Sequence, residues 1–159
     1  MDQDTNFLMR AIELAYVNAE SGGRPFGALV VKDGGIVASG VNEIVSTNDP
    51  TAHAELLAIR AASQKLGSAN LQGCRVFASG HPCPMCMGAM RLAGIDGVTY
   101  AYSNEDGEPF GLSTAQVYAD LAKPFSEQSM KIRHVPLRDA SRLDLYADWE
   151  RRRKNRDQG

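Results

Sequence analysis

Apolar residues recur at helical spacing near the start of the chain, over residues 5–20, where they fall on one stripe of an amphipathic helix. The Ser-Gly-Gly run at 21–23 ends this pattern. Two short apolar stretches with β-branched residues follow at 27–31 and 36–41, and the turn-forming residues 32–35 separate them. The start of the chain therefore predicts a helix followed by a β-hairpin.

Beyond the hairpin, helical and extended patterns alternate. The polar residues 43–50 and 103–111 are expected to be loops, and Asp49-Pro50-Thr51 is typical of a helix start. We expect helices at 52–66, 84–93, 113–121 and 140–153, and strands at 75–79, 98–102 and 131–137. With the hairpin, this order predicts one α/β domain over residues 1–159. Its expected fold has three layers, α/β/α, with helices on both faces of a five-stranded mixed sheet.

Composition narrows the class of protein. The 159 residues suit one hydrophobic core, and no run of about 18 apolar residues is present, so no membrane span is expected. The acidic start, Met1 to Asp4, lacks the basic and then apolar order of a secretory signal, so we expect a cytoplasmic protein. The net charge is −2, and basic residues gather only at 151–156, which argues against a nucleic acid partner.

Two short motifs carry the candidate chemistry. One is His53-Ala54-Glu55, and the other is Pro82-Cys83-Pro84-Met85-Cys86; each lies where a helix is expected to begin. Alone, a His-x-Glu arises by chance, and a Cys-x-x-Cys fits a redox pair, a zinc knuckle or two buried thiols. Together they are far more specific, because Cys83 and Cys86 share one face of a helical turn at a helix N-terminus, which favours thiolates.

The combined motifs predict a catalytic zinc site. His53, Cys83 and Cys86 are the candidate ligands of one Zn²⁺ per chain, whereas Cys74 is expected to be a buried thiol. Three protein ligands leave the fourth tetrahedral position open to water, as in catalytic zinc sites. Glu55 is the candidate proton carrier beside that position. This combination is the known signature of zinc-dependent nucleobase deaminases.

From about Phe7 to Trp149 the chain resembles the cytidine and deoxycytidylate deaminase superfamily, in the branch of bacterial guanine deaminases and tRNA adenosine deaminases. The stretches that carry the resemblance are Pro25-Phe26-Gly27-Ala28, Asn42, Asn48 to Glu55 and Pro82 to Ala89. The resemblance implies a cytidine deaminase-like fold and a homodimer. It also implies hydrolytic removal of an amino group from a nucleobase-like ring, with release of ammonia.

The resemblance implies roles for further residues. Asn42 is expected to hydrogen-bond the base edge, Phe26 to line the pocket, and the backbone N–H of Ala54 to contact the reacting face. His81 stands where the family usually has glutamate before Pro-Cys. We expect His81 in the pocket wall or behind the ligands; zinc ligation and a purely structural role are the alternatives.

Two departures from the guanine deaminases bear on the substrate. That family holds the guanine amino edge with an aspartate after the fourth strand, where this chain has Ser113 and Thr114. It also closes its pocket with a C-terminal tyrosine of the partner subunit, whereas residues 154–159 here contain no aromatic side chain. The candidate substitutes for the missing carboxylate are Glu105, Asp106 and Glu108.

Three functions are compatible with these observations. The leading hypothesis is a zinc-dependent deaminase of a free nucleobase or related amino-heterocycle, such as guanine, isoguanine, a cytosine analogue or an amino-triazine. A tRNA adenosine deaminase would need a broad basic surface and a flipped base. A non-catalytic, zinc-stabilised binding domain would need a fourth ligand and no proton carrier at Glu55.

Overall fold

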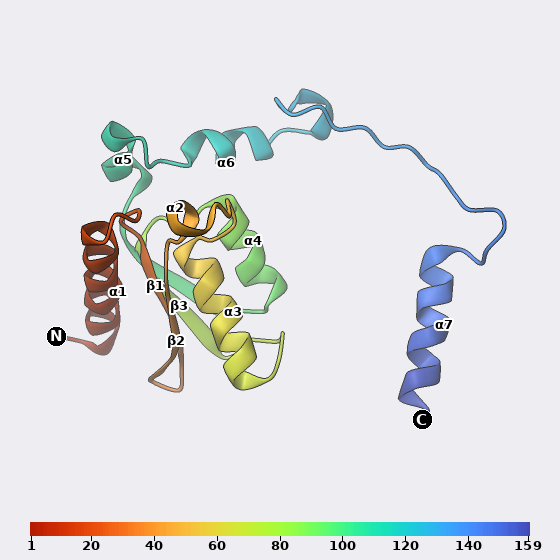
Figure 1. Cartoon of the computed structure of the whole chain (residues 1–159), viewed down its shortest axis with the longest axis horizontal. Helices are drawn as coiled ribbons and strands as arrows, with labels where there is room; N and C mark the ends of the chain where they lie inside the picture. Colours follow the sequence, from red (N-terminus) through yellow and green to blue (C-terminus); the bar gives the residue numbers. More distant parts are fainter. The chain divides into compact units, whose positions relative to one another are not determined.

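The computed structural model describes all 159 residues. They form two compact units, residues 1–122 and residues 123–159, which are described separately below. Figure 1 draws both units. The single-domain organisation expected for the whole chain stays a prediction.

A four-stranded mixed sheet forms the centre of the first unit (Figure 1). Its strands are β1 (Gly27–Lys32), β2 (Gly35–Val41), β3 (Cys74–Gly80) and β4 (Gly97–Tyr102), in the order β2-β1-β3-β4. β1 pairs antiparallel with β2 and with β3, whereas β3 pairs parallel with β4. The predicted hairpin and mixed sheet are confirmed, although the sheet has four strands and not five.

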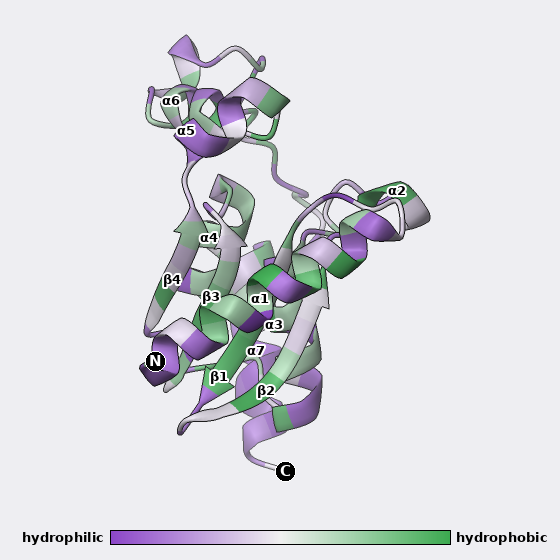
Figure 2. Cartoon of the chain, turned by 90° about the vertical axis from the view of Figure 1, so that its left-hand side faces the viewer, coloured by the Kyte–Doolittle hydropathy of each residue, from purple (hydrophilic) through white to green (hydrophobic).

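Helices cover both faces of the sheet and complete the three expected layers. α1 (Gln3–Glu20) packs on one face, and α3 (Ala54–Leu66) and α4 (Pro84–Leu92) belong to the other. Because successive strand residues point to opposite faces, Leu29 joins the buried cluster under α1, whereas its neighbour Val30 joins the cluster with α3 and α4. Burial on both faces explains why β1 is apolar over most of its length (green in Figure 2).

Both helices of the second face start directly after a candidate zinc ligand. His53 is the N-cap of α3 and Cys83 is the N-cap of α4, each with an extended backbone. Pro84 occupies the first turn of α4, where its missing N–H costs nothing. The Cys86 N–H donates to the Cys83 Sγ atom at 3.5 Å. The expected placement of both motifs at helix starts is confirmed.

The segment before α3 differs from the expectation. A short helix, α2 (Ile44–Thr47), lies within the expected loop. The Asp49 carboxylate then accepts hydrogen bonds from the N–H and the hydroxyl of Thr51. These bonds close a local turn and do not cap a helix, so α3 begins at Ala54 and not at residue 52.

The segment after β4 is more regular than expected. It forms α5 (Asn104–Gly107) and the 3-10 turn η1 (Glu108–Phe110), followed by α6 (Ala115–Leu121), which was expected. The Ser103 hydroxyl accepts from the Asp106 N–H, and the Asp106 carboxylate accepts from the Ser103 N–H. This capping box explains why an acidic, glycine-containing stretch starts with a helical turn.

The second unit contains the 3-10 turn η2 (Phe125–Glu127) and one helix, α7 (Leu145–Asp157). The fifth strand expected at 131–137 is wrong: these residues pair with no strand and are exposed. The last helix was expected from residue 140, but the Asp144 carboxylate accepts from the Tyr146 N–H and fixes its start one turn later. No helix in either unit combines the length and the apolar character needed to cross a bilayer.

Candidate active site

The N-termini of α3 and α4 bring the three candidate zinc ligands together. One ligand atom from each of His53, Cys83 and Cys86 lies within 4.8 Å of the other two. The His53 Nδ1 atom lies 3.3 Å from the Cys83 Sγ atom and 3.7 Å from the Cys86 Sγ atom. One imidazole and two thiols from three positions fit a tetrahedral zinc ion with one position left open. Cys74 is buried outside this group, as expected.

Hydrogen bonds within this group shift its ionisation. The Cys86 side chain, helped by His53, lowers the pKa of the Cys83 thiol to about 4. The hydrogen bond between the two cysteine side chains raises the pKa of Cys86. The hydrogen bond between His53 and Cys83 raises the pKa of His53. The pair therefore favours a thiolate at Cys83, which is the form of cysteine that binds zinc.

Glu55 lies beside the ligand group and is itself no part of it. Its side chain is only 5% exposed, and the Cys86 thiol donates to its Oε2 atom at 3.5 Å. Burial raises the pKa of this carboxyl group above its usual range. A raised pKa makes the carboxylate a better proton acceptor than an exposed glutamate.

β2 fixes the position of the helix that carries Glu55. A Cβ atom at Gly40 would lie 2.4 Å from the Ala54 carbonyl oxygen and 2.7 Å from the Ala58 nitrogen. Only glycine therefore lets the first turn of α3 approach β2 this closely. Ala54 itself is fully buried between them.

Asn42 follows β2 and is almost completely buried, with 4% of its surface exposed. Its N–H donates to the Phe26 carbonyl at 3.1 Å, and its Oδ1 atom accepts from the Ile44 N–H at 3.1 Å. This second bond orients the carboxamide, and its Nδ2 atom has no hydrogen-bond partner within the chain. An oriented carboxamide whose donor has no partner in the chain suits recognition of a polar ligand edge.

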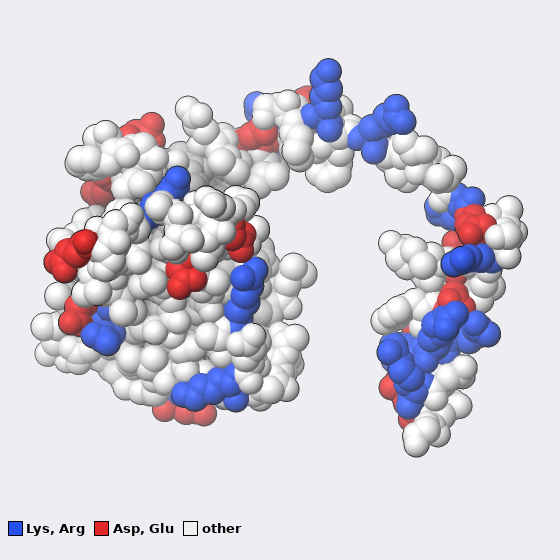
Figure 3. Space-filling view, viewed as in Figure 1, with Lys and Arg blue, Asp and Glu red and all other residues white.

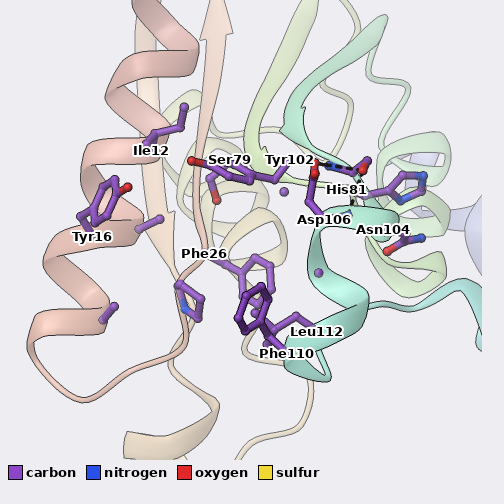
Figure 4. A pocket seen from close by; sticks show the side chains of 16 residues that line it. Ile12, Tyr16, Phe26, Ser79, His81, Tyr102, Asn104, Asp106, Phe110 and Leu112 are labelled. Atoms are coloured by element: carbon purple, nitrogen blue, oxygen red, sulfur yellow. Dashed lines mark hydrogen bonds between the residues drawn. The ribbon is translucent and has the colours of Figure 1, made fainter.

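A cavity of about 620 Å³ lies at the same end of the sheet, between α1 and the segment after β4. Phe26 and His81 line it, together with Tyr16, Tyr102, Phe110 and Leu112. Figure 4 shows Phe26, Phe110 and Leu112 grouped on one side, with Tyr16 projecting from α1. Asn42 and the ligand group are not among the lining residues, so this cavity does not contain the candidate zinc site.

His81 is held between two tyrosine rings. The rings of Tyr100 and Tyr118 meet it edge-on, at centroid distances of 4.8 and 5.3 Å. The His81 Nδ1 atom lies 3.0 Å from the Pro82 carbonyl oxygen, which also accepts from the Tyr118 hydroxyl. His81 is thus held beside the loop that ends in Cys83, and it is not one of the three residues of the ligand group. Sequence reasoning missed Tyr118, because a tyrosine on a short helix carries no motif.

The residues at the position of the missing carboxylate, and the candidate substitute Asp106, differ in how their polar atoms are used. The Ser113 hydroxyl accepts from the Ala115 N–H, whereas the Thr114 hydroxyl is buried and has no partner. The Asp106 carboxylate is occupied by the Ser103 N–H and hydroxyl, and this bonding lowers the pKa of Asp106. Of these groups, Thr114 carries the buried polar atom that lacks a partner.

Comparison with known proteins places this geometry in a family. A model of the cytidine and deoxycytidylate deaminase zinc-binding region matches residues 1–102, so the chain belongs to that family. The matched residues include the whole ligand group and Glu55. The chain is therefore a zinc-dependent deaminase with the cytidine deaminase-like fold.

Individual relatives cover nearly the whole chain. The guanine deaminase of Bacillus subtilis (strain 168) is 43% identical over 151 residues, which span 94% of each chain. A crystal structure of the guanine deaminase from Bacillus subtilis superposes with a TM-score of 0.85 at 39% identity, covering 95% of each chain. The tRNA-specific adenosine deaminase of Aquifex aeolicus is 35% identical over 138 residues, covering 86% of this chain and 88% of that protein.

Proposed function

We propose that His53, Cys83 and Cys86 hold the zinc ion and that Glu55 is the proton carrier of a nucleobase deaminase. The observation that carries this assignment is the convergence of three ligand atoms beside one buried carboxyl group. Zinc bound there supplies a water nucleophile at neutral pH. A purely structural zinc site would need four protein ligands, whereas this group consists of three residues.

In this proposal, Glu55 moves protons between water and substrate. Its carboxylate would accept one proton of the attacking water and deliver it to a ring nitrogen. It would then take the remaining hydroxyl proton from the tetrahedral adduct and pass it to the leaving amine, so that ammonia leaves as the carbonyl forms. Burial raises the pKa of Glu55, which makes its carboxylate a better acceptor for the proton of water. Burial also keeps bulk water from competing for those protons.

The remaining site residues are proposed to bind the ring. The free Nδ2 donor of Asn42 would pair with an acceptor on the base edge, and the Ala54 N–H would contact the reacting face. Phe26, whose carbonyl accepts from the Asn42 N–H, would cover the ring. His81, bound to the Pro82 carbonyl, would support the loop that ends in Cys83.

The proposed substrate is a free nucleobase or a related amino-heterocycle, in line with the activity named for the Bacillus relative. In the first unit, acidic and basic side chains are interspersed, whereas Lys and Arg gather on α7 (Figure 3). Most of those α7 cations are paired with neighbouring acidic residues. A chain of net charge −2 whose clustered cations are mostly paired is poorly suited to RNA.

Guanine is proposed to be a weak substrate within this class. At the position of the family's aspartate, the Thr114 hydroxyl is the unpartnered group, and a hydroxyl cannot replace both acceptor oxygens of a carboxylate. Isoguanine, cytosine analogues and amino-triazines remain the favoured candidates. We also propose that the chain is cytoplasmic and forms a homodimer.

Ammonia release from purified zinc-loaded protein tests the proposal. The panel contains guanine, isoguanine, cytosine, an amino-triazine and a tRNA anticodon stem-loop, and a reaction without protein is the blank. We expect at least one small ring to be deaminated faster than the RNA. A faster reaction with the RNA would replace the proposed substrate class by tRNA adenosine, and ammonia from none of the five would refute the proposed class.

A further inference from the structure

Asn18, near the C-terminal end of α1, joins two segments that are distant in the sequence. Its Nδ2 atom donates to the Arg24 carbonyl at 2.7 Å and to the Asn42 carbonyl at 2.8 Å. Arg24 lies in the loop before β1, and Asn42 follows the end of β2. One carboxamide thus uses both of its protons to connect the two segments.

The joined segments carry two of the proposed substrate contacts. The Phe26 N–H donates to the same Arg24 carbonyl at 2.8 Å, and the Asn42 N–H donates to the Phe26 carbonyl at 3.1 Å. The resulting chain of bonds runs from Asn18 to the backbones of Phe26 and Asn42. Removal of the Asn18 donors would leave the Asn42 carbonyl without its bond to α1 and free the loop before β1.

The glycine beside Asn18 supports the same arrangement. A Cβ atom at Gly23 would lie 2.5 Å from the Asn18 Nδ2 atom. The Gly23 N–H also donates to the Asn18 carbonyl at 2.9 Å. The loop therefore wraps around the Asn18 carboxamide and leaves no room for a side chain at residue 23.

We infer that Asn18 is a positioning residue for substrate recognition, which fixes Phe26 and Asn42 relative to each other. The inference rests on the proposed function, which places both residues against the ring. Asn18 has no hydrogen bond to the ligand group, so its loss should leave zinc in place. Its effect should therefore be on substrate binding and not on the metal.

The kinetic test uses Asn18→Asp, which keeps the shape but removes the donors, and Asn18→Ala, which adds no charge. With the best small ring, we expect KM to rise about tenfold or more and kcat to change less than about threefold, because a misplaced contact weakens binding. Asn6→Asp is the matched control, since Asn6 is an exposed residue of the same helix. Unchanged KM in both Asn18 variants would overturn the inference.

A double-mutant cycle tests whether Asn18 acts through Asn42. In an Asn42→Ala background, Asn18→Ala should raise KM by a clearly smaller factor than in the wild type, because one of the two contacts that it positions is already gone. If Asn18→Ala raised KM by the same factor in both backgrounds, Asn18 would act independently of Asn42, which would overturn the inference. Loss of zinc or of the folded state in both Asn18 variants would assign it a general structural role, with the same consequence.

Hydrogen exchange separates this inference from the proposed function. In zinc-loaded Asn18→Ala protein without substrate, the Asn42 and Phe26 amides should exchange at least about tenfold faster than in the wild type, while β3 amides remain unchanged. This readout applies even if the wild-type protein deaminates no ring in the panel. Unchanged exchange at both amides would overturn the inference whatever the substrate proves to be.

Discussion

Cys83 combines two roles in one side chain, since its sulfur is both the N-cap of α4 and a proposed zinc ligand. Serine caps helices well but is a poor zinc ligand, so Cys83→Ser separates the two roles. We expect this variant to lose zinc and activity together while the helix persists. Metal analysis by mass spectrometry and circular dichroism provide the two readouts.

Cys74→Ala is the matched control for this prediction, because Cys74 is a buried cysteine outside the ligand group. It should retain about one zinc per chain. Cys86→Ala should behave like Cys83→Ser in its metal content. Full zinc occupancy in both the Cys83 and the Cys86 variants would rule out the proposed ligands.

Glu55→Gln tests the proton carrier without disturbing the metal. The amide keeps the size of the side chain but cannot exchange protons, so kcat should fall by at least roughly 10²-fold with zinc and thermal stability retained. Glu20→Gln, the same change at an exposed position, should leave kcat unaltered. Near wild-type turnover by Glu55→Gln would remove Glu55 from the mechanism.

Thr114→Asp tests the argument about guanine. A carboxylate at this buried position would pair with the N–H edge of guanine, and one unmet buried group is worth about 1–3 kcal/mol. We therefore expect kcat/KM for guanine to rise about tenfold. Ser113→Asp is the control, because the Ser113 hydroxyl already accepts from the backbone. A fall with guanine in Thr114→Asp would contradict this reading of the position.

At the residue scale, the sequence predicted the residues whose chemistry requires a fixed spacing along the chain. The sequence alone reveals two cysteines three positions apart at a helix start. It also reveals a histidine two positions before a glutamate. Asn18 and Tyr118 were not predictable, because their partners Asn42 and Pro82 lie far along the chain. Only the folded sheet brings these pairs together.

At the scale of elements, the contact of β2 with α3 at Gly40 determines how close Glu55 comes to the sheet. Gly40→Ala should destabilise the protein by about 1–3 kcal/mol, since the added methyl group meets backbone atoms that cannot move away alone. Activity should fall even where the variant stays folded. Urea denaturation and kinetics with the best ring measure the two effects.

Gly88→Ala makes the same chemical change in the interior of α4, where a Cβ atom would meet nothing within 4 Å. There, alanine should stabilise the protein by about 0.5–1 kcal/mol, because glycine is a poor helix former. If Gly40→Ala were as harmless as Gly88→Ala, close packing of β2 on α3 could not be what positions Glu55.

The strands and long helices of the first unit were predictable because each has a local pattern that burial on the sheet reinforces. The elements that were predicted wrongly lack this agreement between local pattern and burial. Residues 131–137 have a strand-like composition, but a strand exists only where a partner supplies hydrogen bonds, and this segment has none. The turns α2 and α5 depend on local backbone bonds and a capping box, which outweigh the loop-like composition of their sequences.

At the scale of the whole molecule, all proposed site residues lie within residues 1–122, whereas the basic helix α7 belongs to residues 123–159. Deletion of residues 151–159 should therefore leave zinc content at about one per chain. If the tail closes the pocket of a second subunit, as the family resemblance implies, KM should rise several-fold with little change in kcat.

Removal of Gln158 and Gly159 alone is the control, because it leaves α7 intact. Sedimentation of all three proteins shows whether any change in KM accompanies a change in oligomeric state. Loss of zinc in the longer deletion would mean that the site needs residues beyond the first unit. Unchanged KM in a protein that remains dimeric would show that the tail covers no pocket, and the residues that exclude water from Glu55 would then have to come from the first unit itself.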